Sequence, residues 1–412
     1  MAKPLATIST WLFLCLLLVS CAPPASVPAE SKATATSAAA PAVNWEALAQ
    51  QLVTQNASVK ENDIVLIVGG VQDGELLEDI AVHVRKAGAF PLVRITSDRM
   101  TKRMATEVPE QFDSQVLQQD MKLAGLVNVR ISIDSGLAEN PLGDVDPKRR
   151  EALDKATAAV DDEFMKRNVR QVILGNNLYP ADWRAKRYGV SQQEMTKLFW
   201  DGVNMDYAVV PATGAAVKKA LATAKELHIT NPNGTDLKVN IQGKPIGVSD
   251  GVISLEDAKA GGSNATIWLP AGEVYLVPVS GTAEGKVVQT RGTYQESGKE
   301  IEDLTLTFAK GTVVSITGTG PGFGDFKARY DVAGSGKDAL AYIDFGINPR
   351  VKMPEATKYG NWVPAGSITV GIGGNTWAGG DNDTGFAQAL FLPGSTVLVD
   401  GRPIVEKGVL KP

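Results

Sequence analysis

A nearly unbroken apolar run, Asp63–Gly69 (DIVLIVG), constrains the fold of this chain more than any other segment. Such a run is typical of a strand that is buried on both faces of a parallel sheet. Glu75–Lys86 follows with apolar residues at helical spacing, and Gly88 marks the end of that helix. Phe90–Ile95 has the pattern of the next strand. Together these segments predict a right-handed βαβ unit at the start of an α/β fold.

The alternation of strands and helices continues to about residue 228, where the pattern changes. Further helices are predicted over Pro147–Lys166, from a capping signal at Ser191 to about Asp206, and over Pro211–Leu227. From His228 onward we expect strands, Gly-rich turns and little helix, with Gly318–Asp325 as a loop between strands. The sequence therefore predicts an α/β domain over 44–228, with a parallel sheet and flanking helices, followed by a β-rich domain over 229–412.

The first 43 residues are predicted to carry targeting signals. Lys3 precedes the apolar run Trp11–Val19, which is about half the length needed to span a bilayer. Leu18-Val19-Ser20-Cys21 resembles a bacterial lipobox; an ordinary signal that is cleaved nearby is the alternative. We expect a signal peptide over 1–20, a lipid on Cys21 and a disordered stalk over 21–43. This predicts a membrane-anchored lipoprotein of the cell envelope that faces the extracytoplasmic side, with the choice of membrane left open.

Composition argues against several kinds of site. Cys15 would leave with the signal peptide, so the mature chain keeps only Cys21 and has no disulfide, thiolate nucleophile or Cys-based metal site. Only two histidines are present, His83 and His228, and both precede the β-rich half. We interpret them as packing or surface residues. The formal net charge of -5 and the absence of a basic run argue against nucleic acid as a partner.

A series of short motifs, in order along most of 45–412, resembles the aminopeptidase T family of thermophilic metallo-aminopeptidases. The motifs are Val59–Val65, Lys86–Ala89, Asn233–Leu237 with Val239, Leu269–Tyr275 with Pro278, Gly346–Pro349 and Val399–Ile404. The resemblance implies a two-domain fold that is commonly dimeric. It also implies a metal-dependent aminopeptidase with two ions in the C-terminal half, held by two Glu, two His and one Asp, with a Tyr close by.

Carried over residue by residue, most of those ligand positions are substituted. Glu273 matches the family's first Glu, whereas Tyr342 occupies the place of the second, with Asp344 two residues further on. Thr369 stands where the family has its first His. The family's His-x-Asp pair corresponds to Ala387-Gln388-Ala389, and an Ala cannot bind a metal. We therefore expect no cofactor, or a divalent metal ion if the protein is active.

Two further features are candidate sites. Glu273, paired with Asp344 or Glu284, would suit acid–base catalysis or a single Ca²⁺ or Mg²⁺ ion, although such carboxylates are more often satisfied by backbone donors. The Gly-rich stretch 373–385 is either a ligand-contacting loop or a long turn. The binding candidates are Tyr342, Thr369, Trp377, Asn382 and Asp383.

These observations favour a lipid-anchored, aminopeptidase-T-like protein that lacks the dinuclear metal site and acts as a binding or accessory protein. A small molecule or peptide would occupy its cavity, and a homodimer is implied by the resemblance alone. The alternative is an active hydrolase with an altered, oxygen-ligated site at Glu273 and Asp344. A purely structural envelope protein is a third possibility.

Overall fold

The computed structural model describes residues 43–294, 297–354 and 362–411. The predicted signal peptide over 1–20, the predicted lipidation site Cys21 and the predicted stalk up to residue 42 lie outside the described residues. Within the described ranges, no helix combines the length and the apolar character needed to cross a membrane.

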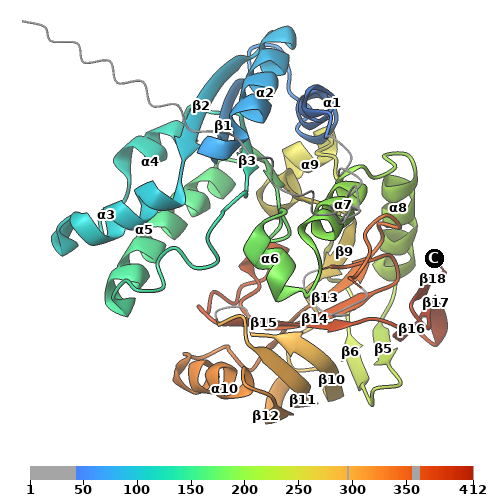
Figure 1. Cartoon of the computed structure of the whole chain (residues 1–412). Helices are drawn as coiled ribbons and strands as arrows, with labels where there is room; N and C mark the ends of the chain where they lie inside the picture. The colour runs from blue at the N-terminus through green and yellow to red at the C-terminus, as the bar shows by residue number, and fades with distance from the viewer. Residues whose placement is uncertain (1–42, 295–296, 355–361, 412) are drawn as a thin grey trace, which may run out of the picture. The chain divides into compact units, whose positions relative to one another are not determined.

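Five parallel strands form the first sheet, sheet A, in the order β2-β1-β3-β4-β8 (Figure 1). In chain order the strands are Ile64–Gly70 (β1), Phe90–Thr96 (β2), Val129–Ile133 (β3), Arg170–Leu174 (β4) and Thr266–Leu269 (β8). The predicted βαβ unit is confirmed, because β1 and β2 pair in parallel and helix α2 connects them.

Most helices lie in the first half of the chain. Their bounds are Trp45–Gln51 (α1), Gly74–Lys86 (α2), Asp98–Glu107 (α3), Gln118–Ala124 (α4), Pro147–Lys166 (α5), Asp182–Arg187 (α6), Gln192–Val203 (α7), Val209–Ala222 (α8), Leu255–Ala260 (α9) and Phe323–Val332 (α10). A π-helical turn at Leu52–Asn56 (η1) continues α1. Short 3₁₀ turns occur at Val71–Asp73 (η2), Glu110–Phe112 (η3), Gly262–Ala265 (η4) and Thr376–Ala378 (η5).

Strand β1 is covered on both faces, as its apolar run predicts. Val65 and Ile67 pack with Leu76 of α2 in the main core. Leu66 points to the opposite face and packs with Phe164 of α5 in a second cluster. Successive side chains of a strand alternate between faces, so a run without polar residues requires a helix layer on each side.

Two antiparallel sheets make up most of the second half. Sheet B has the order β12-β11-β10-β6-β5-β16-β17-β18, and sheet C has the order β15-β14-β13-β9-β7. The strands of sheet B are Thr312–Thr319, Glu300–Ala309, Glu284–Thr293, Asp236–Asn240, Glu226–Thr230, Thr396–Val399, Arg402–Glu406 and Val409–Leu410, in that order. Those of sheet C are Ala387–Leu392, Ile368–Gly373, Leu340–Gly346, Glu273–Leu276 and Ile246–Ser249. The predicted fold class, an α/β part followed by a β-rich part, is confirmed.

Three details differ from the sequence predictions. Helix α7 ends at Val203, a few residues short of the predicted end. Helix α8 also ends early, at Ala222, because β5 already begins at Glu226. A helix, α10, follows the glycines of 318–322, where we predicted only a loop. Phe326 and Tyr330 of this helix stand one turn apart and pack on Phe386, so two aromatic contacts stabilise a helix with a weak apolar pattern.

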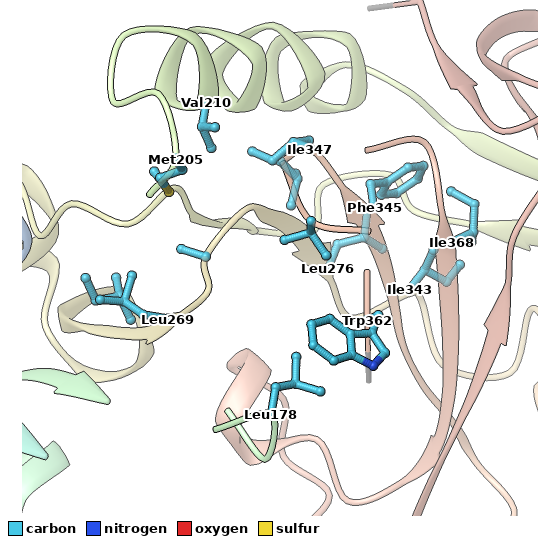
Figure 2. Packing of buried hydrophobic residues seen from close by; sticks show 14 of the residues in the cluster. Leu178, Met205, Val210, Leu269, Leu276, Ile343, Phe345, Ile347, Trp362 and Ile368 are labelled. Carbon is cyan, nitrogen blue, oxygen red and sulfur yellow. The ribbon is translucent and has the colours of Figure 1, made fainter. Parts of the chain in front are cut away.

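The segment 246–276 ties the sheets together. It supplies β7 and β9 to sheet C, and between them β8 returns to sheet A beside β4. One continuous core links the two sheets as a result. Figure 2 shows part of it, with Leu269 at the end of β8, Val210 of α8 and Phe345 of β13. This packing brings the ends of β4 and β8 to one face of sheet C.

Candidate active site: a carboxylate and aromatic cavity

Sheet C has two chemically different faces. On one face, Ile343 and Phe345 of β13 and Val370 of β14 belong to the core and are fully buried. The alternate residues of the same strands, Tyr342, Asp344 and Thr369, therefore point to the other face. This second face lines a cavity and carries the polar side chains of the candidate site.

Strand register sets the positions of these side chains. Asp344 of β13 pairs with Thr369 of β14 on one side and with Tyr275 of β9 on the other. Glu273 pairs with Gly346, so it is the diagonal neighbour of Asp344 on the same face. Diagonal neighbours across a strand pair are roughly 7–8 Å apart, within reach of long side chains. The two carboxylates therefore share one cavity.

Gly371 makes room for the ring of Tyr342. The two residues pair across β13 and β14, and a Cβ atom added to Gly371 would overlap ring atoms of Tyr342. Only glycine lets a ring lie this close to the neighbouring strand. The same arrangement recurs at Gly247, which faces the ring of Tyr275. Small residues thus let aromatic rings lie flat along this face of the sheet.

The cavity has a volume of about 270 Å³. Its wall is made by residues of sheet A, sheet C and the loops beside them: Asn176, Asn177, Trp268, Glu273, Tyr342, Asp344, Val363, Thr369, Trp377 and Phe391. Asn176 and Asn177 follow β4 with φ values of 46° and 58°, so the chain turns sharply at the carboxyl end of that strand. Trp268 lies at the corresponding end of β8.

Three rings surround one side of the cavity. Trp377, in the turn η5, has its ring centroid 4.8 Å from that of Tyr342, at an interplanar angle of 77°. The Trp268 ring is 6.1 Å from that of Trp377 and almost perpendicular to it, at 88°. Edge-to-face pairs of this kind are favourable.

Burial changes the acidity of both carboxylates. Desolvation raises the pKa of Glu273 to about 7. Desolvation also raises the pKa of Asp344 well above its ordinary value, with a further increase from the charge of Glu273. No Lys, Arg or His is among the described residues that line the cavity, so no cation there offsets the two acids. A proton shared by the pair is the expected state near neutral pH.

Two polar atoms of the site have no hydrogen-bond partner among the described residues. These atoms are Oδ1 of Asp344 and Oγ1 of Thr369, whose residues are 4% and 2% exposed. Buried polar atoms in folded proteins are normally hydrogen-bonded, and an orphaned pair at a cavity wall is a place where a ligand would bind. The site thus combines incompletely satisfied polar groups with aromatic rings.

The structure brings together five of the residues singled out in the sequence. Glu273, Asp344, Tyr342, Thr369 and Trp377 all line the one cavity. The predicted alternative pairing of Glu273 with Glu284 was wrong, because Glu284 lies at the start of β10, where its Oε1 accepts a hydrogen bond from the Lys310 amide at 2.8 Å.

The other two candidates of the loop 373–385, Asn382 and Asp383, are not among the residues that line the cavity. The Asn382 amide donates to the carbonyl oxygens of Gly336 and Gly373, at 2.8 and 2.7 Å, and so fastens the loop. Asp383 is exposed and does not line the cavity. Neither histidine lies there: His83 pairs with Glu46 at 3.0 Å, and His228 contacts Asp236 at 2.7 Å.

Sequence reasoning missed several wall residues. Asn176 and Asn177 could have been found, because they directly follow a predicted strand of a parallel sheet, at the edge where such folds bind ligands. Trp268 lies in a short run without a clear period, and no signal placed that run in sheet A. Phe391 lies on the edge strand β15, two residues after Ala389, the last position that we assigned to a lost metal ligand.

A second cavity, of about 180 Å³, adjoins the first. Asn177 and Phe391 belong to the walls of both. Its remaining wall residues are Glu139, Trp183, Arg187, Tyr188, Gln289, Thr293, Gln388 and Ala389. Ala389 and Gln388, at the place of the family's His-x-Asp pair, thus face this neighbouring space. A ligand in the first cavity has room to extend past Asn177.

The arrangement of a parallel sheet followed by antiparallel sheets is similar to that of two solved structures. The wild-type AmpT of Thermus thermophilus has a TM-score of 0.68 and 15% identity, covering 90% of this chain and 99% of that chain. The 2,5-dihydroxypyridine dioxygenase of Pseudomonas putida KT2440 has a TM-score of 0.59 and 13% identity, covering 89% and 96%. At these identities the likeness concerns the fold alone.

The fold class of this chain is therefore the one that these two structures share. The chain belongs to the thermophilic metalloprotease (M29) family, whose model matches residues 42–320. The resemblance predicted from the sequence motifs is confirmed. A comparison with curated proteins found no match.

Aminopeptidases of this family depend on divalent metal ions, and the residues of the cavity do not fit a pair of such ions. Glu273 and Asp344 are the acids in its described wall, which contains neither His nor Cys. Across the described ranges, no group of three or more His, Cys, Asp or Glu side chains could hold a metal ion. Two closely spaced ions need more anionic and imidazole donors than these two carboxylates supply.

Proposed function

We propose that this chain is a member of the M29 family that has lost the dinuclear metal centre and acts as a binding or accessory protein. The observation that carries the proposal is the donor set of the cavity: two carboxylates, a threonine hydroxyl and a tyrosine, with aromatic rings around them. A hydroxyl group at Thr369 is a poor substitute for an imidazole, because neutral oxygen donors hold a transition metal ion only weakly.

The electrostatics of the cavity support this proposal. Carboxylates that hold two divalent ions must be ionised, yet desolvation raises the pKa of both Glu273 and Asp344. Without more donors, much of the binding free energy of an ion would go into deprotonating the pair. The orphaned oxygens of Asp344 and Thr369 nevertheless indicate that the cavity accommodates a ligand.

We also propose that the protein is tethered to a membrane through a lipid on Cys21 and faces the extracytoplasmic side. This part rests on the lipobox-like segment Leu18–Cys21. Metabolic labelling with a fatty acid tests it. Label should enter the chain and disappear in Cys21→Ala, and label that persists in that variant would overturn the anchoring.

The proposed loss of the metal centre is tested by metal analysis of the purified full chain. We expect well below one zinc, cobalt or manganese ion per chain and no release of amino acids from unblocked peptides. The variant Thr369→His adds an imidazole beside Asp344 and Glu273, and it should gain about one zinc ion as a third donor completes the site. About two tightly held ions in the unmodified chain, together with peptide hydrolysis, would refute the proposal.

A second candidate function is hydrolysis at a single oxygen-ligated ion. The free oxygens of Asp344 and Thr369, close to Glu273, favour it. Peptide hydrolysis that requires Mg²⁺ or Ca²⁺ and is lost in Glu273→Ala would establish it. Absence of turnover across a broad peptide panel, with and without each ion, would remove it.

A further inference from the structure

Four aromatic side chains, Trp268, Tyr342, Trp377 and Phe391, stand beside the polar residues of the cavity wall. The rings of Trp377 and Tyr342 meet at 77°, and those of Trp377 and Trp268 meet at 88°. Ring planes that meet nearly at right angles form the corner of a box. The negative face of each ring attracts a cation placed within roughly 6 Å of its centre. The two indole rings of this corner contribute no metal ligand, and Tyr342 contributes a single hydroxyl oxygen, so the corner favours an organic cation over a metal ion.

The acids beside this corner are not neutralised by other residues of the wall. Asp344 is 4% exposed, its Oδ1 atom has no partner among the described residues, and Thr369 beside it also has a free oxygen. No described residue of the wall carries a positive charge. A buried carboxylate without a counter-charge is costly, and a cationic ligand would offset that cost.

The combination of rings and acids selects among ligands. A small divalent ion needs about six oxygen ligands or retained waters, and the three rings cannot supply them. An anion would be repelled by Glu273 and Asp344. A neutral apolar molecule would leave the oxygens of Asp344 and Thr369 unpaired. An ammonium group suits both the acids and the rings. A primary ammonium donates hydrogen bonds to the acids, a fully methylated one is attracted to them by its charge, and the carbon substituents of either contact the rings.

We propose that this cavity binds a small organic cation, a primary or methylated ammonium group held between the Trp377–Tyr342–Trp268 corner and the carboxylates Asp344 and Glu273. The inference rests on the proposed function, because two metal ions held at Glu273 would occupy the same space. The cavity of about 270 Å³ suits a compact cation. The remainder of a longer molecule extends past Asn177 and Phe391 into the second cavity.

Calorimetric titration of the full chain tests the proposal with pairs of probes that differ in charge. Choline is compared with 3,3-dimethylbutan-1-ol, its neutral isostere, and butylamine is compared with butan-1-ol, a neutral alcohol of equal size. We expect at least one cation to bind roughly tenfold or more tightly than its neutral counterpart. Equal binding of both members in every pair would overturn the inference.

Two variants locate the binding. Trp377→Leu keeps an apolar side chain but removes a ring face, and it should weaken cation binding roughly 5- to 30-fold. Asp383→Asn is the matched control, because Asp383 is an exposed acid of the same loop outside the cavity wall, and this variant should bind like the unmodified chain. Cation binding that is insensitive to Trp377→Leu, or that is lost equally in Asp383→Asn, would contradict the assignment.

Metal analysis of the same samples separates the two proposals. If the chain holds about two metal ions and cleaves peptides, the proposed function fails and the cation site fails with it. If the chain is free of metal and inactive yet prefers no cation, only the ligand assignment is wrong. Mg²⁺ or Zn²⁺ binding that depends on Asp344 but not on Trp377 would also overturn the ligand assignment.

Discussion

Replacement of Gly371 by alanine probes the packing that holds Tyr342 against the cavity. A Cβ atom at Gly371 would overlap Cε1, Cδ1 and Cζ of the Tyr342 ring. Gly371 does not have a positive φ, so the alanine would be strained by the ring and not by its own backbone. Overpacking of a buried site costs about 1–3 kcal/mol. We expect a loss of this size in the free energy of unfolding.

A double-mutant cycle shows whether the ring is the cause. In a Tyr342→Ala background the ring is absent, so Gly371→Ala should be neutral or should stabilise the protein by up to about 1 kcal/mol through the unfolded chain. The two substitutions should therefore show a coupling of about 1–3 kcal/mol, as expected for residues in direct contact.

Equilibrium unfolding in urea of the four chains measures this coupling. Gly324→Ala is a matched control, because no atom lies within 4 Å of a Cβ added there in α10. It should leave stability unchanged or raise it by up to about 1 kcal/mol, since alanine favours a helix over glycine. The reasoning is refuted if Gly371→Ala costs the same free energy with and without the Tyr342 ring.

Two further predictions concern stability. The pKa of Glu273 is raised from 4.5 to about 7, so the folded state binds a proton more tightly than the unfolded state. The stability that this proton binding contributes is fully present below pH 4.5 and is lost as the pH rises to about 7. The loss amounts to about 3 kcal/mol. Glu273→Gln should therefore make the free energy of unfolding depend less on pH across that range. An unchanged pH dependence in this variant would count against the raised pKa of Glu273. Asn348 is fully buried, and its amide donates to the carbonyl oxygens of Gly202 at 3.0 Å and Ala271 at 2.7 Å. Asn348→Ala should therefore lower the free energy of unfolding, measured by heat or urea, by about 2–4 kcal/mol. A loss below about 1 kcal/mol would show that water replaces these bonds.

The local pattern of the sequence predicted the first half of the fold well. The run at β1 has no polar residue that could face solvent, so it predicted a parallel sheet between two helix layers. In the structure, Val65 and Leu66 indeed pack into different hydrophobic clusters on the two faces of the strand. The position of β8 could not be read in the same way. Its four residues carry no period, and pairing with β4, almost a hundred residues earlier, depends on contacts that no local pattern reports.

The site was predictable where register mattered and unpredictable where packing did. Glu273 was chosen from its match to the family's first Glu, and Asp344 from its place two residues after Tyr342 on one strand. Antiparallel register does put the two carboxylates on one face. By contrast, the two Asn residues after β4 and Trp268 reach the cavity only because β4 and β8 end beside sheet C. The loop 373–385 divides in the same way, since Trp377 contacts Tyr342 whereas Asp383 is exposed.

The substitutions at the ligand positions and the aromatic wall have a common physical consequence. The Tyr342 ring lies over Gly371 and lines the cavity together with the two carboxylates. A ring-lined space weakens the binding of a divalent ion, which gives up its hydration only for many oxygen donors. The same space strengthens attraction between an aromatic face and an organic cation, because desolvation increases that interaction to about 2 kcal/mol or more. Under the proposed loss of the metal ligands, the cavity would therefore favour a different cation and keep its preference for positive charge.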